Sequence, residues 1–347
     1  MALLDVSGLQ VTFDTPDGEV SAVSGMDLAI EAGETLAIVG ESGSGKTQLM
    51  LALLGLLAEN GRAAGRALFK GKDLMRMSPR ELNAVRGRHI AMIFQDPMTS
   101  LNPYLSIEKQ MVEVVMHHQG LSRDEARAHA VEMLRAVRIP DPEERIRQFP
   151  HEYSGGMRQR VMIAIGLLCE PDLLIADEPT TALDVTVQAQ ITELVGEIRK
   201  QHQMAIVLIT HDLAAVAEVS DRIIVMYAGE TVETGSAEDI FYRPQHPYTR
   251  GLLASLPRLD RDSGDELQVI PGNPPNLEDL PPGCRFRERC GEAMEQCRQR
   301  PPVWVDGERM SRCFLPMEGG RILAPSAGPT PAEATAGADG PGSEEAS

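Results

Sequence analysis

The chain has 347 residues, of which 42% are hydrophobic and 24% are charged, and its 33 basic against 51 acidic residues give a formal net charge of −18. A chain of this length can bury a large core and favours two domains. The acidic balance argues against a nucleic acid as the main partner, because neutralising phosphates requires an excess of lysine and arginine.

The first residues contain no basic and apolar leader. The longest apolar runs, at residues 49–58 and 161–169, reach about half of the length that spans a bilayer. We therefore expect a protein of the cytoplasm, where disulfides do not persist, so that its cysteines need another explanation.

Hydrophobic patterns and turn residues predict alternating strands and helices along the first 255 residues. Strands are predicted at residues 3–13, 35–39, 172–176 and 204–210, with short strands between 60 and 95 and a hairpin at 222–227 and 231–234. Helices are predicted at residues 45–57, 105–138, 157–168 and 185–201. Alternating buried strands and helices favour an α/β core with a mainly parallel sheet, which a helix-rich block at about 97–157 interrupts as an inserted subdomain.

The composition changes after residue 255. Residues 256–318 are rich in proline and then in cysteine and arginine, with little periodicity, which predicts a small irregular module. Residues 319–347 are rich in Gly, Ala, Pro, Ser and Glu, which is typical of a disordered tail.

A glycine-rich loop follows the predicted strand at 35–39 and leads into an apolar helix. It reads Gly40-Glu41-Ser42-Gly43-Ser44-Gly45-Lys46-Thr47 and fits the pattern G-x-x-x-x-G-K-[ST]. The glycines allow a tight loop whose N–H groups point at phosphates, Lys46 supplies a positive charge, and the Thr47 hydroxyl can ligate Mg²⁺. An ordinary turn is the alternative, which the flanking strand and helix disfavour. We therefore predict that the chain binds a nucleoside triphosphate with Mg²⁺.

Two carboxylates follow the predicted strand at 172–176. Asp177 is expected to hold Mg²⁺, and Glu178 is expected to polarise the attacking water as a general base. A pair of carboxylates after a strand is a weak signal alone, and a phosphate loop upstream of it makes the signal strong.

The segment Tyr153-Ser154-Gly155-Gly156-Met157 resembles the signature loop of the ATP-binding-cassette (ABC) family. Tyr153 and Met157 replace the usual Leu and Gln, while the phosphate-binding Ser154, Gly155 and Gly156 are intact. The resemblance implies a cassette fold with a RecA-like core, an antiparallel β subdomain and an inserted helical subdomain.

Further family elements occur in the expected order along the chain. By resemblance, Gln95 is the glutamine that senses Mg²⁺ and water, Asp184 belongs to the D-loop, and His211 contacts the γ-phosphate. Phe13 is a candidate to stack on adenine, and an equally good alternative is that it is a core residue of its strand.

In this family two cassettes pair head to tail, so Ser154 to Gly156 are expected to act on the ATP of the partner chain. Segments at residues 95–103, 178–191, 246–253 and 271–275 are similar to those of peptide-importer ATPases. This implies a paralogous ATPase partner, two transmembrane permease subunits and an extracytoplasmic peptide-binding protein, with the chain peripheral on the cytoplasmic face of the membrane. Importers of dipeptides, nickel or glutathione share nearly all of these segments, whereas exporter ATPases and ABC proteins of DNA repair or translation fit less well.

Four cysteines, Cys284, Cys290, Cys297 and Cys313, lie close together in the sequence. Four thiolates can hold zinc or a [4Fe–4S] cluster, and the spacing lacks the C-x₂₋₄-C pairs of structural zinc sites. The resemblance to peptide-importer ATPases favours a [4Fe–4S] cluster, with zinc or free thiols as alternatives. Cys169 lies in an apolar helix and is expected to pack in the core.

Overall fold

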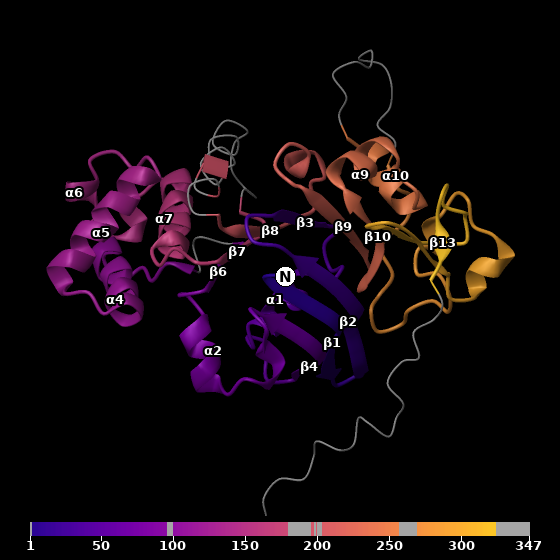
Figure 1. The fold of residues 1–347 in the computed structure, drawn as a ribbon, viewed down its shortest axis with the longest axis horizontal. Helices are drawn as coiled ribbons and strands as arrows, with labels where there is room; N and C mark the ends of the chain where they lie inside the picture. The colour runs from indigo at the N-terminus through magenta and orange to yellow at the C-terminus, as the bar shows by residue number, and fades with distance from the viewer. Residues whose placement is uncertain are drawn as a thin grey trace, which may run out of the picture.

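The computed structural model describes residues 2–95, 100–179, 196–197, 199, 203–256 and 269–323. The helix predicted at 185–201 therefore lies largely outside the described residues. Figure 1 shows three parts side by side: a group of helices, a central region with two sheets, and the C-terminal residues on the opposite side. Within the described ranges, no helix is both long and apolar enough to cross a membrane.

The central sheet contains the strands that carry the predicted site. Its order is β13-β11-β12-β10-β9-β3-β8-β7-β6. The parallel strands are β3 (Thr35–Val39), β6 (Ile90–Ile93), β7 (Leu173–Asp177), β8 (Ala205–Thr210) and β9 (Arg222–Tyr227). Every residue of β3 and β7 is buried, as expected for parallel strands that are covered on both faces.

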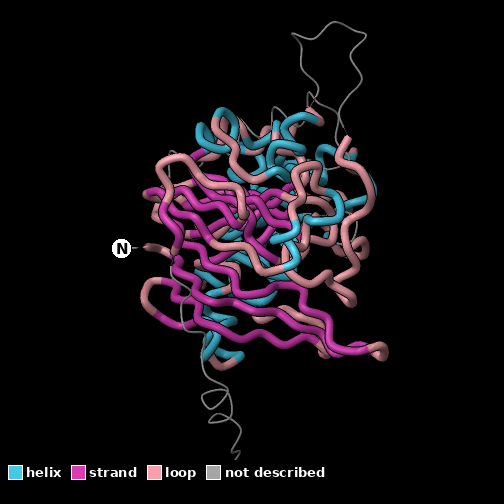
Figure 2. The backbone as a smooth tube through the Cα atoms, turned by 90° about the vertical axis from the view of Figure 1, so that its right-hand side faces the viewer, coloured by secondary structure: helices cyan, strands magenta, loops and turns pink. Residues whose placement is uncertain are grey.

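A second, antiparallel sheet contains the N-terminal strands in the order β2-β1-β4-β5. These are β1 (Leu4–Thr15), β2 (Gly18–Ile30), β4 (Gly61–Phe69) and β5 (Lys72–Asp73). Helix α1 (Lys46–Leu53) shares one apolar core with strands of both sheets. The long strands of this second sheet lie in the lower part of Figures 1 and 2, below the central sheet. Helix α2 (Pro79–Val85), which the sequence analysis did not predict, starts at Ser78 with a capping box to Glu81.

The inserted helical subdomain has its own core. Its helices are α4 (Ile107–Gln119), α5 (Arg123–Ala136), α6 (Pro142–Arg145) and α7 (Gly155–Leu167). The helical segment predicted at 105–138 contains two helices, α4 and α5. Gly120 ends α4 in the left-handed conformation with φ of 70°, and Ser122 and Glu125 form a capping box that starts α5.

The C-terminal residues continue the central sheet rather than forming a separate irregular module. After β10 (Glu230–Ser236), α9 (Ala237–Tyr242) and α10 (Pro247–Ala254), the extension contains β11 (Val303–Asp306), β12 (Arg309–Arg312) and β13 (Arg321–Ile322). Strand β12 pairs antiparallel with β10, with Ser311 opposite Glu233. Short 3₁₀ helices at Leu74–Arg76, Pro150–Glu152, Ala214–Val216, Arg287–Arg289 and Glu295–Arg298 complete the described elements. Strand β13 lies within the predicted tail, and residues 324–347 lie outside the described ones.

A buried histidine fixes the start of α10. His246 is 1% exposed, and its Nδ1 accepts a hydrogen bond of 3.1 Å from the N–H of Tyr248. The backbone N–H of His246 donates a hydrogen bond of 2.9 Å to Glu233 Oε2, and this bond connects the start of α10 to β10. Burial lowers the pKa of His246 from 6.5 to about 3, so the imidazole stays neutral in the folded protein.

This burial predicts an acid-sensitive contribution to stability. The folded pKa lies below the unfolded one, so the contribution is complete above pH 6.5 and is lost as the pH falls towards 3. Between pH 6.5 and 5 the loss amounts to about 2 kcal/mol. His246→Asn keeps a capping side chain without a titrating group. Urea unfolding of the full chain at both pH values should therefore give a smaller loss for the variant, and equal losses would contradict this assignment.

Candidate functional site

The phosphate loop follows β3 and runs close to neighbouring backbone. A Cβ atom at Gly40 would lie 2.2 Å from the carbonyl oxygen of Met226, and one at Gly45 would lie 2.2 Å from that of Ala22. Gly45 also has φ of 95° as the residue that precedes α1. Both positions therefore require glycine, which explains two fixed positions of the motif. Ser42 and Gly43 lie in the exposed part of the same loop.

Lys46 lies inside this loop and is 5% exposed. Its Nζ donates to the carbonyl oxygens of Gly40 at 2.6 Å and Glu41 at 2.9 Å, and to Ser44 Oγ at 3.4 Å. Burial lowers the pKa of Lys46, while the charges of Glu178, Asp177 and Glu41 act in the opposite direction. All three ammonium donors engage the loop, so a phosphate that binds here must compete for them.

Thr47 and Asp177 meet across the end of the sheet. Thr47 Oγ1 donates a hydrogen bond of 2.8 Å to Asp177 Oδ2. Asp177 is 3% exposed, and burial raises its pKa. A hydroxyl and a carboxylate are hard oxygen ligands of the kind that Mg²⁺ takes, so the pair fits the predicted Mg²⁺ site.

Glu178 lies between two other predicted site residues. Gln95 Nε2 donates to Glu178 Oε2 at 2.9 Å, and His211 Nδ1 lies 3.1 Å from Glu178 Oε1. The three residues follow β6, β7 and β8, whose carboxyl ends meet at one edge of the parallel sheet. Glu178 has φ of 46°, an uncommon backbone conformation for a residue with a side chain, and such strain is frequent at functional sites.

The signature residues form the N-terminus of α7. Ser154 and Gly155 are exposed, and Ser154 Oγ accepts a hydrogen bond of 3.3 Å from the N–H of Met157. Tyr153, which replaces the usual Leu, is 2% exposed, and its hydroxyl donates to the carbonyl oxygen of Arg145 at 2.7 Å. Burial raises the pKa of Tyr153 to about 12. The replacement thus fills the helical core, while Gly155 next to it remains exposed.

The structure contains a contact that the sequence analysis did not predict, between helix α7 and the residues that follow β7. Gln159 in α7 is 1% exposed, and its Nε2 donates to the carbonyl oxygen of Pro179, directly after Glu178. In the sequence, the one signal for this contact is that Gln159 is a polar residue in an apolar helix. A buried amide needs a hydrogen-bond partner, so such a residue is expected to form one.

Two predicted site residues, Phe13 and Asp184, are left untested by the described part of the chain. Phe13 is half-buried in β1 opposite Val20, and its ring lies against Gly61 and the core. This position agrees with the interpretation of Phe13 as a core residue of its strand, and it does not test whether Phe13 stacks on adenine. Asp184 lies outside the described residues.

The metal prediction for the C-terminal cysteines is not supported. Cys284, Cys290, Cys297 and Cys313 line one cavity, but its volume is about 10 Å³, which is room for no more than one water. Burial raises the pKa of Cys284 to about 11 and also raises those of Cys290 and Cys313. In the described part of the chain, no group of three or more His, Cys, Asp or Glu residues is placed to hold a metal ion. Cys169 is buried, as predicted, and is 9% exposed.

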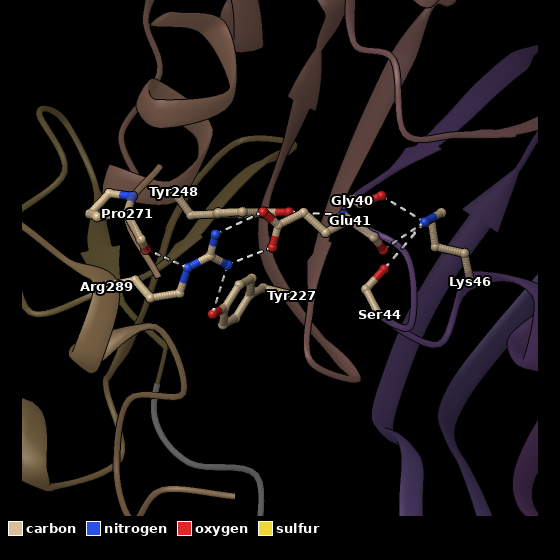
Figure 3. A network of polar contacts seen from close by, with 8 residues as sticks. All are labelled: Gly40, Glu41, Ser44, Lys46, Tyr227, Tyr248, Pro271 and Arg289. Atoms are coloured by element: carbon tan, nitrogen blue, oxygen red, sulfur yellow. Dashed lines mark hydrogen bonds and ion pairs between the residues drawn. The ribbon is translucent and has the colours of Figure 1, made fainter. Parts of the chain in front are cut away.

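One contact to the phosphate loop was missed entirely. Arg289 of the extension forms an ion pair with Glu41 inside the loop (Figure 3). Arg289 contributed to the sequence analysis only as part of an arginine-rich segment, and Glu41 only as a variable motif position.

Comparisons with known proteins agree with this architecture. A family model for "ABC transporter" matches residues 23–181, and a model for "Oligopeptide/dipeptide transporter, C-terminal region" matches residues 232–297. The oligopeptide transport ATP-binding protein OppD of Salmonella typhimurium is 56% identical over 91% of this chain and 94% of its own length. The dipeptide transport ATP-binding protein DppD of Bacillus subtilis is 53% identical over 85% and 88%.

Solved structures show the same cassette fold. One is a dimeric ATP-binding cassette in a post-hydrolysis state bound to ADP and Pi, with a TM-score of 0.61 and 25% identity, covering 67% of this chain and 98% of that one. Another is cbiO1 from Clostridium perfringens, part of an ABC transporter complex, with a TM-score of 0.59 and 30% identity, covering 70% and 91%. The chain therefore belongs to the ABC transporter family, among the ATP-binding subunits that carry the oligopeptide/dipeptide transporter C-terminal region.

Proposed function

We propose that this chain is the ATP-hydrolysing subunit of a membrane peptide importer. The observation that carries the ATPase assignment is the contact of Glu178 with both Gln95 and His211, next to the Thr47–Asp177 pair. The peptide substrate rests on the identity to oligopeptide and dipeptide transport proteins along almost the whole chain.

In the proposed mechanism, Lys46 and the N–H groups of the phosphate loop bind the β- and γ-phosphates of ATP. Mg²⁺, held by Thr47, Asp177 and Gln95, would neutralise the phosphate charge. Glu178 accepts the proton of the attacking water, and Gln95 orients that water. His211 holds Glu178 on its other oxygen and contacts the γ-phosphate.

The signature residues act in a dimer. Ser154, Gly155 and Gly156 are exposed or half-exposed at a helix N-terminus, which is a favourable site for an anion. We assign them to the ATP of a paralogous partner ATPase, with Asp184 at the same interface and Phe13 against the adenine. ATP closes this dimer, and hydrolysis reopens it.

The dimer is proposed to drive two transmembrane permease subunits from the cytoplasmic face of the membrane, with an extracytoplasmic protein that supplies the peptide. Dipeptides, nickel and glutathione are the alternative substrates. ATP hydrolysis by the complex, co-purified through this chain and supplied with its binding protein, separates them. Stimulation by longer peptides supports the oligopeptide assignment, and the absence of co-purifying membrane subunits contradicts the importer.

The cysteines carry a separate proposal, that Cys284, Cys290, Cys297 and Cys313 bind a [4Fe–4S] cluster or, alternatively, zinc. Their shared cavity supports it, and the small volume of that cavity counts against it. If they do bind metal, the site stabilises the extension, because a metal that binds only the folded state adds its binding energy to folding.

Replacing Glu178 by Gln removes the base and keeps the shape of the side chain. We expect ATP turnover by the complex to fall about 10²- to 10⁴-fold, with ATP binding retained. Glu132→Gln, at a 70% exposed site in α5, is the control. Turnover near that of the wild type would remove Glu178 as the base.

Gly155→Asp tests the signature loop. A Cβ atom at Gly155 meets nothing within 4 Å, so the chain should fold and bind ATP as before. The added charge should repel the partner's phosphates, and ATP-dependent dimer formation and turnover should be lost. Gly291→Asp, at another open position, is the control. An ATP-dependent dimer of normal stability in Gly155→Asp would contradict a role for this loop in trans.

The metal proposal is tested by iron, sulfide and zinc analysis of full-length protein purified without oxygen. We expect about four irons and four sulfides per chain for the cluster, or one zinc for the alternative, and loss of the metal in Cys284→Ser. Metal-free protein of normal stability would leave the four cysteines as packing residues.

A further inference from the structure

We propose that Arg289 in the C-terminal extension is a positioning residue for the phosphate loop, and that it acts by holding and neutralising Glu41. This inference rests on the proposed ATPase function. The two guanidinium nitrogens contact the two carboxylate oxygens separately, Nη1 with Oε2 at 2.6 Å and Nη2 with Oε1 at 2.9 Å (Figure 3). Such a bidentate pair fixes the carboxylate in direction as well as in distance.

The guanidinium is itself held on every side. Arg289 is 8% exposed, its Nε donates to the carbonyl oxygen of Pro271 at 2.9 Å, and its Nη1 lies 3.3 Å from Tyr227 Oη. Its central carbon lies 5.8 Å from the ring centroid of Tyr227 and 6.0 Å from that of Phe286. Lysine could not replace Arg289 here, because its ammonium group is not planar and can neither form the bidentate pair nor stack on the rings in the same way.

Glu41 connects this pair to the lysine of the loop. Its N–H donates to Tyr248 Oη at 3.0 Å, and its carbonyl oxygen accepts from Lys46 Nζ at 2.9 Å. Tyr248 is fully buried and packs against Tyr227 with ring centroids 4.7 Å apart. The side chain, N–H and carbonyl of one loop residue are therefore each tied down, two of them by residues outside the loop.

Because Glu41 is negatively charged, its ion pair with Arg289 is expected to affect the binding of ATP. Glu41 is an acidic residue inside a loop that binds a polyanion, and its charge already acts on Lys46. Without Arg289 this negative charge would be uncompensated beside the phosphates. The effect is the same in the ground state and the transition state, so it changes binding and not the chemical step.

The extension approaches the loop at a second place. A cavity of about 340 Å³ has loop residues 41–44 on one side and extension residues 274–278 on the other. The extension therefore lies next to the phosphate loop at this cavity as well as at the Arg289–Glu41 ion pair. These features make the extension a part of the nucleotide site.

The first test is Arg289→Gln in the transport complex. We expect the KM for ATP to rise about tenfold with kcat within about twofold of the wild type. The matched control is Arg298→Gln in the same extension, where the arginine is 70% exposed and pairs with the exposed Glu295 at 3.3 Å. An unchanged KM in Arg289→Gln beside an active wild-type complex would overturn the proposal, whereas an inactive wild-type complex would instead overturn the ATPase assignment.

The double variant Glu41→Gln/Arg289→Gln separates this role from a purely structural ion pair. It removes the negative charge together with its partner, so we expect the KM for ATP to return to within about threefold of the wild type. A contact that only holds the fold would leave the double variant as impaired as the single one, and that result would refute the proposal. Arg289→Lys keeps the charge and loses the bidentate geometry, and its KM should lie between those of the wild type and Arg289→Gln.

Tyr248→Phe provides a second route if Arg289→Gln does not fold. The change removes only the hydroxyl that accepts the Glu41 N–H, and the aromatic packing remains. We expect the affinity of the full chain for ATP to fall about threefold to tenfold. An affinity equal to that of the wild type would show that the position of Glu41 does not affect the phosphate loop.

Discussion

The parallel pairing of β6, β7, β8 and β3 is the constraint on which the rest of the structure depends. Each strand pairs in register with the next, so their carboxyl ends reach the same edge of the sheet. Residues that are far apart in the sequence, such as Gln95 and His211, both contact Glu178 only because of this alignment. The same burial that stabilises the strands raises the pKa of Asp177 and lowers that of Lys46. Burial disfavours the charged forms of Asp177 and Lys46, and the attraction between the two charges opposes this effect.

The site residues that follow strands were predictable from the sequence for this reason. A buried strand, the residue type after it and the order along the chain identify Thr47, Asp177 and Glu178, and the parallel topology then brings them together. Helix boundaries depended on smaller signals. The break between α4 and α5 depends on Gly120 and the Ser122 capping box, which a search for long polar and apolar periodicity overlooks.

Contacts between distant residues could not be predicted in this way. Arg289 and Glu41 are separated by 248 positions, and no periodic pattern links two charged residues across such a distance. The short strands β11 and β12 pair with each other and join the sheet through β10, although their sequence carries little alternation. The cysteine spacing suggested a metal site, and the four cysteines do line one cavity, but spacing along the chain does not fix how their side chains are placed relative to one another.

The extension and the cassette share one sheet and several ion pairs, among them Arg289–Glu41, Arg285–Glu230 and Arg309–Asp239. The matched C-terminal region, which begins at residue 232 within β10, therefore does not coincide with a boundary in the fold. If Arg289 positions Glu41, binding energies at the two places are linked. Anything that shifts Arg289 changes the affinity for ATP, and ATP must change the stability of the Arg289 contact by the same factor. The aromatic residues Tyr227, Tyr248 and Phe286 make this linkage stiff, because their rings pack with centroids 4.7 to 5.3 Å apart and two of them, Tyr227 and Phe286, lie against the guanidinium of Arg289. A displacement of the extension would therefore be transmitted to Lys46 through Glu41, which contacts both Arg289 and Lys46.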